Sequence, residues 1–230
     1  MGDPSLPSTD AGVERLLVSW QRNADPWTRA VRERRIESRR LGTDAAILAA
    51  VRERQPARVL DVGCGEGWLC RALMTDGIET LGIDGSPLLI EAARSAGGRF
   101  ETLAYADWPA HPRRFGLFNA VVCNFALLDE HPHTLLTGLR DALAPGGALL
   151  IQTVHPWTAA GEEGYRDGWR LERFAAFGEG FSPMPWYFRT LGSWVALLHA
   201  AGMRLESVRE PSHPVSGLPL SLLLVAGADK

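Results

Sequence analysis

The sequence is nearly without lysine and contains few cysteines. Lys230 is the only lysine among 230 residues, so arginine carries almost all of the positive charge, which we interpret as coding bias. The three cysteines, Cys64, Cys70 and Cys123, form no CxxC pair and no Cys/His zinc pattern. This usage is typical of a reducing compartment and predicts no metal site. A chain of this length can bury a sizeable core without disulfide staples.

Long apolar runs are also missing from the sequence. No run approaches the roughly 18 residues that a membrane-spanning helix needs, and the opening MGDPSLPSTD lacks the basic and apolar regions of a signal peptide. We therefore expect a cytoplasmic protein without a membrane partner. The formal net charge of −3 argues against a nucleic-acid partner, because such proteins neutralise phosphates with an excess of basic residues. The sequence leaves the oligomeric state open.

Residues 13–56 have the apolar spacing of helices. Leu16 and Trp20 recur at the period of one helix face, and Pro26 predicts a break in that helix. Residues 1–12 are rich in proline, serine and aspartate, so we expect them to form a disordered tail.

Between residues 57 and 154, short β-type runs alternate with helical segments. The expected strands are residues 58–62, 80–83, 100–103, 117–123 and 148–154, and the expected helices are residues 68–75, 88–96 and 134–144. Such alternation predicts a mostly parallel sheet with helices on both faces.

Residues 190–230 resume a regular pattern after a long interruption. A helix over residues 190–201 precedes strands at 204–209 and 219–226, and their short connection predicts an antiparallel pair. With these two strands the predicted fold is α/β, with seven strands in the sheet. The interruption, residues 155–189, is rich in aromatics and glycine, and structureless connections of this length are uncommon unless they are lids or binding loops.

A glycine-rich turn follows the first predicted strand, in the segment VLDVGCGEGW at residues 59–68. Glycine lets the backbone approach a ligand where a side chain would block it. The pattern is GxGxG, with Asp61 two residues before the first glycine, Gly63. The dinucleotide fingerprint GxGxxG would need a third glycine where Trp68 stands.

Polar residues also stand at the ends of the next strands. Asp84 ends the second, where an acid can accept two hydrogen bonds from a ribose. Asp107 and Trp108 follow the third, and this pair can accept from an exocyclic amine and stack on a purine. Asn124 ends the fourth strand candidate. Because open α/β sheets bind ligands at the carboxyl ends of their strands, the coincidence predicts a ligand site at this edge.

On these motifs the chain resembles the class I S-adenosylmethionine (SAM) dependent methyltransferases, and most closely their small-molecule branch of type 11 or type 12. The resemblance is strong over residues 58–154, where Pro145-Gly146-Gly147 before the fifth strand is a further landmark, and moderate over residues 191–226. It implies a Rossmann-like α/β fold with a closing antiparallel hairpin, SAM as the cofactor and a small-molecule acceptor.

The resemblance also implies which residues hold the cofactor. Residues 57–154 would form the SAM-binding core, and the helices of residues 13–56 would cover the cofactor cleft, with Trp27 or Arg39 closing on the carboxylate of SAM. The implied cofactor-binding residues, in chain order, are Asp61, Gly63, Cys64, Gly65, Asp84, Gly85, Ser86, Ala106, Asp107, Trp108, Asn124 and Phe125.

Histidines offer candidates for a general base. Relatives often carry a histidine soon after the fourth strand, and here His131 and His133 stand there without a pattern that says which faces the site. Our candidate catalytic residue is His155, at the tip of the fifth strand, because an imidazole can accept a proton near neutral pH. The alternative is a structural histidine that is hydrogen-bonded within its loop.

The aromatic segment of residues 155–189 is our hypothesis for a lid that forms the acceptor pocket. Trp186, Tyr187 and Phe188 could wall off a planar acceptor and exclude water, with Tyr165 as a polar contact. The alternative is a small hydrophobic cluster beneath a long loop.

The predicted activity is in-line transfer of a methyl group from SAM to an O, N or S atom of a small molecule. A non-catalytic SAM-binding module is an alternative, because an intact glycine turn does not prove turnover. An NAD-dependent oxidoreductase is disfavoured by Trp68 in the third-glycine position. A nucleic-acid methyltransferase is disfavoured by the negative net charge.

Overall fold

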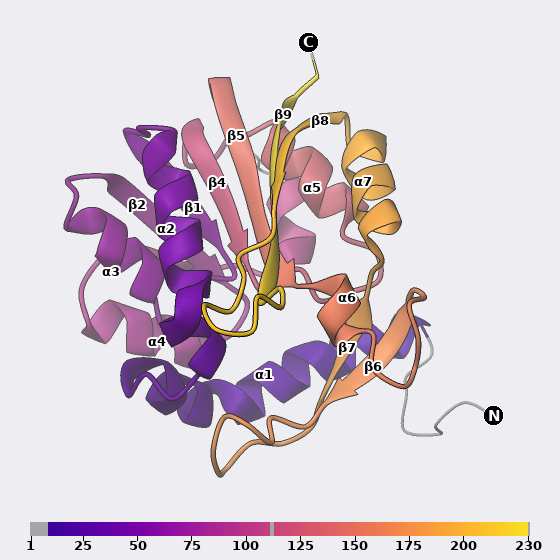
Figure 1. The fold of residues 1–230 in the computed structure, drawn as a ribbon. Coiled ribbons are helices and arrows are strands. Elements are labelled where there is room, and N and C mark those ends of the chain that lie inside the picture. The colour runs from indigo at the N-terminus through magenta and orange to yellow at the C-terminus, as the bar shows by residue number, and fades with distance from the viewer. Residues whose placement is uncertain (1–8, 111–112, 230) are drawn as a thin grey trace.

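A seven-stranded sheet runs through the centre of the computed structural model, which describes residues 9–110 and 113–229 (Figure 1). The strand order is β3-β2-β1-β4-β5-β9-β8. The strands are β1 (Arg58–Val62), β2 (Glu79–Asp84), β3 (Phe100–Thr102), β4 (Phe118–Asn124), β5 (Leu143–Val154), β8 (Met203–Arg209) and β9 (Ser221–Ala228).

The sheet is parallel over its first five strands and antiparallel over its last two. β1 pairs in parallel with β2 and β4, and β5 continues the parallel set beside β4. β9 inserts antiparallel between β5 and β8. This confirms the predicted α/β, Rossmann-like fold with a closing antiparallel pair, in which strand order reverses between β1 and β4 and opens a crevice at their carboxyl ends.

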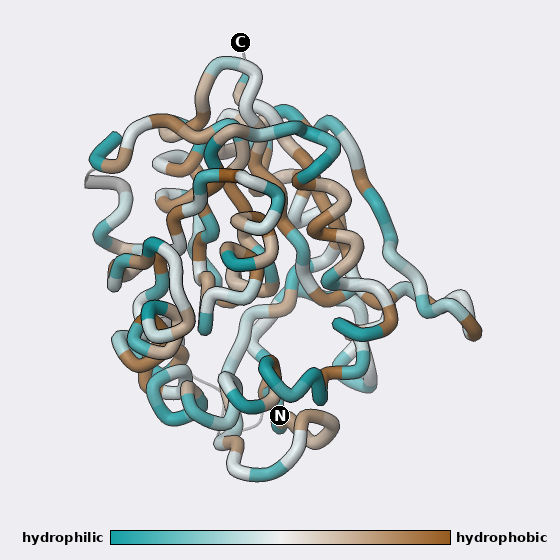
Figure 2. The backbone as a smooth tube through the Cα atoms, turned by 90° about the vertical axis from the view of Figure 1, so that its left-hand side faces the viewer, coloured by the Kyte–Doolittle hydropathy of each residue, from teal (hydrophilic) through white to brown (hydrophobic). Residues whose placement is uncertain are grey.

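Helices cover both faces of the sheet. One face carries α2 (Asp44–Glu53), α3 (Trp68–Met74) and α4 (Pro87–Ser95), and the other carries α5 (His133–Arg140) and α7 (Leu191–Ala200). Side chains alternate along β1, so that Val59 packs against the α2 and α3 side while Leu60 packs against the α5 and α7 side. In Figure 2 many of the hydrophobic segments lie in the interior, and the hydrophilic ones lie mostly on the outside. The core between these layers fixes the strand tips that carry the site.

The first helix differs from the sequence prediction at both its start and its middle. α1 (Thr9–Arg32) begins inside the stretch predicted to be a disordered tail; residues 1–8 of that stretch lie outside the described residues. The helix also continues through Pro26, where we predicted a break. Pro26 is buried beside Gly180, and this packing outweighs the single backbone hydrogen bond that proline removes. A π-turn, η1 (Arg39–Thr43), then leads into α2.

The aromatic segment contains regular structure that the sequence did not predict. A short helix, α6 (Pro156–Ala159), is followed by an antiparallel pair of strands, β6 (Gly168–Glu172) and β7 (Met184–Phe188). β7 packs on α1, and together they lie across the carboxyl edge of the central sheet (Figure 1). Within the described ranges, no helix combines the length and apolar character required to cross a membrane.

Candidate active site

A cavity of about 450 Å³ opens where β1, β2 and β4 end. Its floor comes from the strand tips and the turns that follow them, and its roof comes from α1. The α1 residues that line it are Leu16, Leu17, Trp20 and Trp27. The lining residues of the β-sheet edge and the loops include Gly63, Gly65, Asp84, Gly85, Ser86, Ala106, Asn124, Phe125, Leu128, Asp129 and His131. A cleft of this size at the switch point of the sheet can hold a nucleoside-sized ligand.

The glycine turn after β1 forms one wall of this cavity. Gly63 and Gly65 have left-handed backbones, with φ of 71° and 56°, and both line the cavity. The N–H groups of Gly63 and Cys64 donate to the Ile83 carbonyl at 2.8 and 3.0 Å, which ties the turn to β2. A Cβ atom at Gly63 would lie 2.3 Å from the hydroxyl oxygen of Tyr105. Only glycine therefore leaves backbone bare at this point of the wall.

Asp84 stands at the end of β2 with its carboxylate held from two sides. The N–H of Gly65 donates to Oδ2 at 3.0 Å, and the N–H of Ser86 donates to Oδ1 at 2.8 Å. Burial raises the pKa of Asp84, and these two backbone donors work against that rise. Each oxygen keeps a further lone pair that can accept from a ligand hydroxyl. Ser86 also caps α4, since its hydroxyl accepts from the N–H of Leu89.

Two predicted cofactor residues lie behind the turn and not on the cavity wall. Asp61 is 2% exposed, and the Cys70 thiol contacts its Oδ2 at 3.6 Å. Burial raises the pKa of Asp61 to about 7; the Cys70 thiol opposes this rise and the neighbouring Asp84 adds to it. Cys64 is buried in a small apolar cluster with Ile90 and Phe100. Both side chains therefore pack in the interior behind the glycine turn and support it there.

Of the three residues after β3 that were predicted to lie beside a purine, one lines the cavity and two do not. Ala106 lines the cavity, whereas Asp107 is exposed and is not among the lining residues. Trp108 is 1% exposed, and its ring stacks on Phe115 at a centroid distance of 6.2 Å. The Trp108 indole does not face the cavity, because the short helix η2 (Tyr105–Ala110) turns it into the core. Tyr105 lines the cavity in its place.

Asn124 and Phe125 meet the cavity at the tip of β4. Gln152 on β5 donates through Nε2 to Asn124 Oδ1 and to the Thr43 carbonyl, each at 2.9 Å. Because the Asn124 oxygen is used in this way, its amide N–H groups remain as donors. Phe125 has a left-handed backbone with φ of 53°, which is costly for a residue other than glycine and is found often at functional sites.

Of the two histidines that follow β4, one on the loop and one at the start of α5, only the loop histidine lies at the cavity. His131 lines the cavity, while His133 Nε2 bonds the Ala200 carbonyl on α7 at 3.0 Å. Asp129 also lines the cavity, and its Oδ1 accepts from the backbone N–H of His131 at 2.7 Å. Burial raises the pKa of Asp129, partly offset by the His131 N–H and the Arg189 charge. The sequence showed this polar loop, but no spacing rule selected Asp129 from it.

His155, our predicted catalytic residue, does not face the cavity. Its Nδ1 accepts from the backbone N–H of Trp157 at 3.3 Å and caps α6. Its Nε2 bonds Glu210 at 2.8 Å, so both ring nitrogens have partners. The structural alternative therefore fits: the strand tip of β5 carries His155 toward the β8–β9 connection and away from the ligand crevice.

The four aromatic residues predicted to contact the acceptor lie outside the cavity wall as well. Phe188 is fully buried beneath the Arg170 guanidinium, and Tyr165 meets it edge to face. Trp186 packs in a cluster around Leu16. The backbone N–H of Tyr187 donates to the Leu128 carbonyl at 2.8 Å. Trp186 therefore supports α1 and Tyr187 supports the loop after β4, each from outside the cavity.

α1 is fastened to the β6–β7 hairpin near its middle. The Asn23 amide donates through Nδ2 to the Ser182 carbonyl at 2.9 Å and accepts through Oδ1 from the Ser182 N–H at 2.8 Å. The Asn23 side chain is fully buried, and Ser182 is half-buried, so water reaches this reciprocal pair from the Ser182 side only. The pair holds the roof of the cavity in place, since Trp20 and Trp27 flank Asn23 along the same helix.

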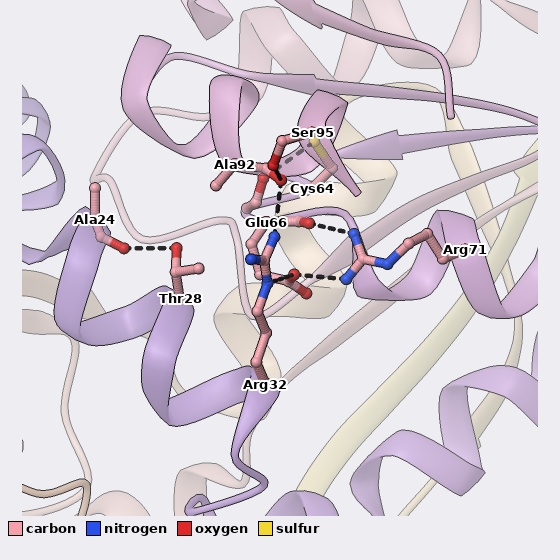
Figure 3. A network of polar contacts seen from close by, with 9 residues as sticks. Ala24, Thr28, Arg32, Cys64, Glu66, Arg71, Ala92 and Ser95 are labelled. Carbon is pink, nitrogen blue, oxygen red and sulfur yellow. Dashed lines mark hydrogen bonds and ion pairs between the residues drawn. The ribbon is translucent and has the colours of Figure 1, made fainter. Parts of the chain in front are cut away.

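The last turn of α1 is fastened to the glycine turn. Arg32 donates to Glu66 Oε2 at 3.1 Å and to the Ala92 carbonyl at 2.8 Å, and Arg71 reaches the same Glu66 oxygen at 2.5 Å (Figure 3). The Glu66 side chain has no exposed surface. A residue inside the GCGEG segment thus anchors the helix that covers it. Arg39, proposed to close the cleft, instead lies 4.4 Å over the Trp68 ring.

Replacing Asn23 by alanine should loosen the roof of the cavity. Three hydrogen bonds are lost, two to the Ser182 backbone and one to the Ser19 hydroxyl, so we expect a loss of about 2 kcal/mol in the free energy of unfolding. Urea unfolding measures this loss, and limited proteolysis should show faster cutting between β6 and β7. Gln21→Ala removes an exposed side chain from the same helix and should change neither reading. If Asn23→Ala and Gln21→Ala change stability and proteolysis equally, Asn23 does not hold α1 on the β6–β7 hairpin.

Comparisons with known proteins point to one family. Residues 32–208 match the family model described as a methyltransferase domain. A ubiquinone biosynthesis O-methyltransferase of Xanthomonas oryzae pv. oryzae is 34% identical over 113 residues, which cover 45% of this chain and 46% of that protein. The chain therefore spans about half the length of this curated relative.

Solved structures share the fold. The 1,6-didemethyltoxoflavin-N1-methyltransferase of Burkholderia thailandensis, solved with 1,6-didemethyltoxoflavin and S-adenosylhomocysteine (SAH), has a TM-score of 0.67 at 22% identity. The similarity covers 100% of this chain and 94% of that one. An S-adenosylmethionine dependent methyltransferase of Mesorhizobium loti has a TM-score of 0.58 at 24% identity, covering 77% of this chain and 95% of that one.

Proposed function

The chain belongs to the methyltransferase-domain family, and from this premise we propose that it is a SAM-dependent methyltransferase. It transfers a methyl group to an O, N or S atom of a small-molecule acceptor by in-line displacement. The observation that carries the proposal is the pairing of the bare glycine turn with the Asp84 carboxylate on one cavity wall. The relatives that bind SAH or methylate small molecules support it.

The residues at the cavity fit this cofactor. Gly65 leaves space beside Trp27 that a Cβ atom would enter, and Gly63 packs against Tyr105 and Ala126 on the same wall; this bare turn suits the methionine and ribose portion of SAM. Asp84 has lone pairs for both ribose hydroxyls, with Gly85 and Ser86 beside it. Ala106 and Tyr105 give an apolar wall for a purine, with Asp107 outside it. The amide of Asn124 faces the boundary between cofactor and acceptor, with Phe125 next to it.

SAM supplies a methyl group on a sulfonium, already activated for displacement. The task of the protein is therefore to orient the acceptor and exclude water. Holding the acceptor atom about 3–3.5 Å from the methyl carbon contributes roughly 7–11 kcal/mol to lowering the barrier. α1 performs the exclusion, because Leu16, Leu17, Trp20 and Trp27 close the cavity from above.

A proton acceptor, where the reaction needs one, is found on the loop after β4. Asp129 and His131 both line the cavity, and either can hold the proton that an O–H or N–H acceptor gives up. His155 has no part in this step, because its two nitrogens are engaged at α6 and Glu210.

Calorimetry with SAH and with NAD separates the proposed function from an oxidoreductase. We expect SAH to bind and NAD not to bind measurably. Asp84→Asn should weaken SAH by about tenfold or more, because the amide replaces a charged acceptor of two hydroxyls by a neutral group with one acceptor oxygen. The melting temperature should change by only a few degrees, because the substitution removes a buried charge but also leaves one of the two backbone N–H groups without its acceptor. Affinity for NAD without affinity for SAH would refute the proposal.

Turnover distinguishes an enzyme from a binding module. Metabolite extracts incubated with labelled SAM should yield SAH and a labelled small molecule, whereas nucleic acid should remain unlabelled. SAH binding without release of SAH over a broad extract series would support the binding module instead.

A further inference from the structure

Part of the cavity is left over once the cofactor residues are assigned. This remainder lies between α1 and the loop after β4, and its apolar lining includes Leu16, Trp20, Leu128 and Leu135. An apolar lining that includes the Trp20 indole, on which a ring can stack, accepts a planar ring more readily than a flexible polar chain.

The charges at the cavity are of one sign. Among the described lining residues, Asp84 and Asp129 are the only aspartates or glutamates, and there is no arginine or lysine. A carboxylate or phosphate on the acceptor would therefore enter without a cationic partner, close to two acids. In a site of low effective dielectric, such like-charge contacts are costly.

The loop that carries Asp129 is contacted by an arginine that does not line the cavity. Arg189, which follows β7, donates through Nη2 to the backbone carbonyl of Asp129 at 2.6 Å. Its guanidinium lies 4.7 Å over the Tyr187 ring and 5.2 Å over the Trp194 ring. It is 6% exposed and is not among the cavity-lining residues. The Arg189 guanidinium therefore does not face the cavity, where it could pair with an anionic acceptor.

The loop that carries Asp129 is held rigidly by the β6–β7 hairpin. Tyr187 bonds Leu128 on one side of Asp129, and the Trp169 indole donates to Glu130 at 3.0 Å on the other. Within the described residues, the Asp129 carboxylate accepts one hydrogen bond, from the His131 N–H. One carboxylate oxygen at the cavity is thus left to accept from a ligand, on a backbone that three contacts keep in place.

We propose that the acceptor is a planar, aromatic hydroxyl or amine that is neutral or cationic and donates a hydrogen bond to Asp129. Acceptors that carry a carboxylate or phosphate are selected against. This inference rests on the proposed function and adds to it the chemical class of the acceptor. Asp129 is the residue that determines this selectivity, and the β6–β7 hairpin acts through the loop to position it.

Three catechols that carry differently charged substituents at the same ring position test the charge preference. 4-Methylcatechol is neutral, dopamine is cationic and 3,4-dihydroxybenzoate is anionic. Their affinities are measured by calorimetry at pH 8 for the protein saturated with SAH. We expect the neutral and cationic catechols to bind, and the anionic one to bind at least tenfold more weakly than dopamine.

Two variants assign the preference to Asp129. Asp129→Asn should weaken dopamine about tenfold and narrow the gap between dopamine and 3,4-dihydroxybenzoate, with the affinity for SAH within twofold of wild type. Glu91→Gln removes one negative charge from an exposed position of α4 and should leave all four affinities unchanged.

Each other outcome has a definite meaning. Equal binding of dopamine and 3,4-dihydroxybenzoate, or binding of none of the three catechols by a protein that binds SAH, overturns the acceptor class and leaves the proposed function standing. A loss of SAH affinity in Asp129→Asn as large as that in Asp84→Asn places Asp129 in the cofactor site and overturns its role in selectivity. If the wild-type protein does not bind SAH, the proposed function itself is refuted.

Discussion

Replacing Gly63 by alanine should abolish measurable SAH binding, with a loss of at least a hundredfold. The new Cβ atom would lie 2.3 Å from the Tyr105 hydroxyl oxygen and 2.5 Å from the Ala126 Cβ. The Tyr105 ring can swing aside, but Ala126 can move only with its backbone, in the turn that follows β4. The cavity wall next to Asn124 would then shift, and errors of about 1 Å in positioning are expensive for a binding or catalytic site.

A matched glycine separates this clash from backbone strain. Gly77 has φ of 79°, close to the 71° of Gly63, but a Cβ atom there would meet nothing within 4 Å. Both alanine variants bear the left-handed penalty of roughly 1–2 kcal/mol. Gly77→Ala should therefore lower the melting temperature by a few degrees and leave SAH binding intact. Calorimetry and thermal unfolding of both variants make the comparison, and intact SAH binding by Gly63→Ala would contradict the placement of the cofactor at this turn.

The sheet was predictable because its strands alternate with helices at short intervals. Residues 58–62, predicted as the first strand, are observed as β1, and the antiparallel ending followed from a connection too short for a crossover helix. The β6–β7 hairpin was not predictable in the same way. Its strands are interrupted by Pro185 and flanked by glycines, and it is held by packing on α1, far away in the sequence.

In the candidate site, too, the residues placed by local sequence could be predicted and those placed by tertiary contacts could not. Gly63 and Asp84 could be predicted because a strand-to-helix turn brings local sequence directly to the sheet edge. The orientation of Trp108 and His155 could not be predicted, because it depends on tertiary contacts, with Phe115 and with Glu210, that no local pattern encodes. The roof residues Leu17 and Trp20 carry the signal of an ordinary amphipathic helix, since contact with a ligand leaves the same apolar spacing as contact with a core.

Asp61 should make the unliganded protein less stable as the pH rises from about 4 to about 7. It is almost completely buried, and burial raises its pKa from the ordinary 3.8 to about 7. Across this window the folded protein keeps a proton that the unfolded chain has released, so the free energy of unfolding falls with increasing pH. Above pH 7 the accumulated loss is about 4 kcal/mol.

Asp61→Asn removes this loss, because an amide of the same shape does not ionise. We expect the variant to match the wild type at pH 4 and to exceed its free energy of unfolding by about 2–4 kcal/mol at pH 8, with a melting temperature higher by roughly 5–15 °C. Urea unfolding of both proteins at a series of pH values measures the difference. Glu91→Gln, an exposed acid on α4, should follow the wild-type pH dependence.

The same variant should bind SAH more weakly than the wild type does. Buried charges that lower the stability of a protein are often found at functional sites, where stability is lost in exchange for function. Asp61 fits this description, because it lies directly beneath the glycine turn and beside Asp84. An Asp61→Asn protein that is more stable at pH 8 and binds SAH more weakly would show that the buried Asp61 charge contributes to cofactor binding. An Asp61→Asn protein whose stability at pH 8 equals that of the wild type would show that Asp61 does not govern this part of the pH dependence.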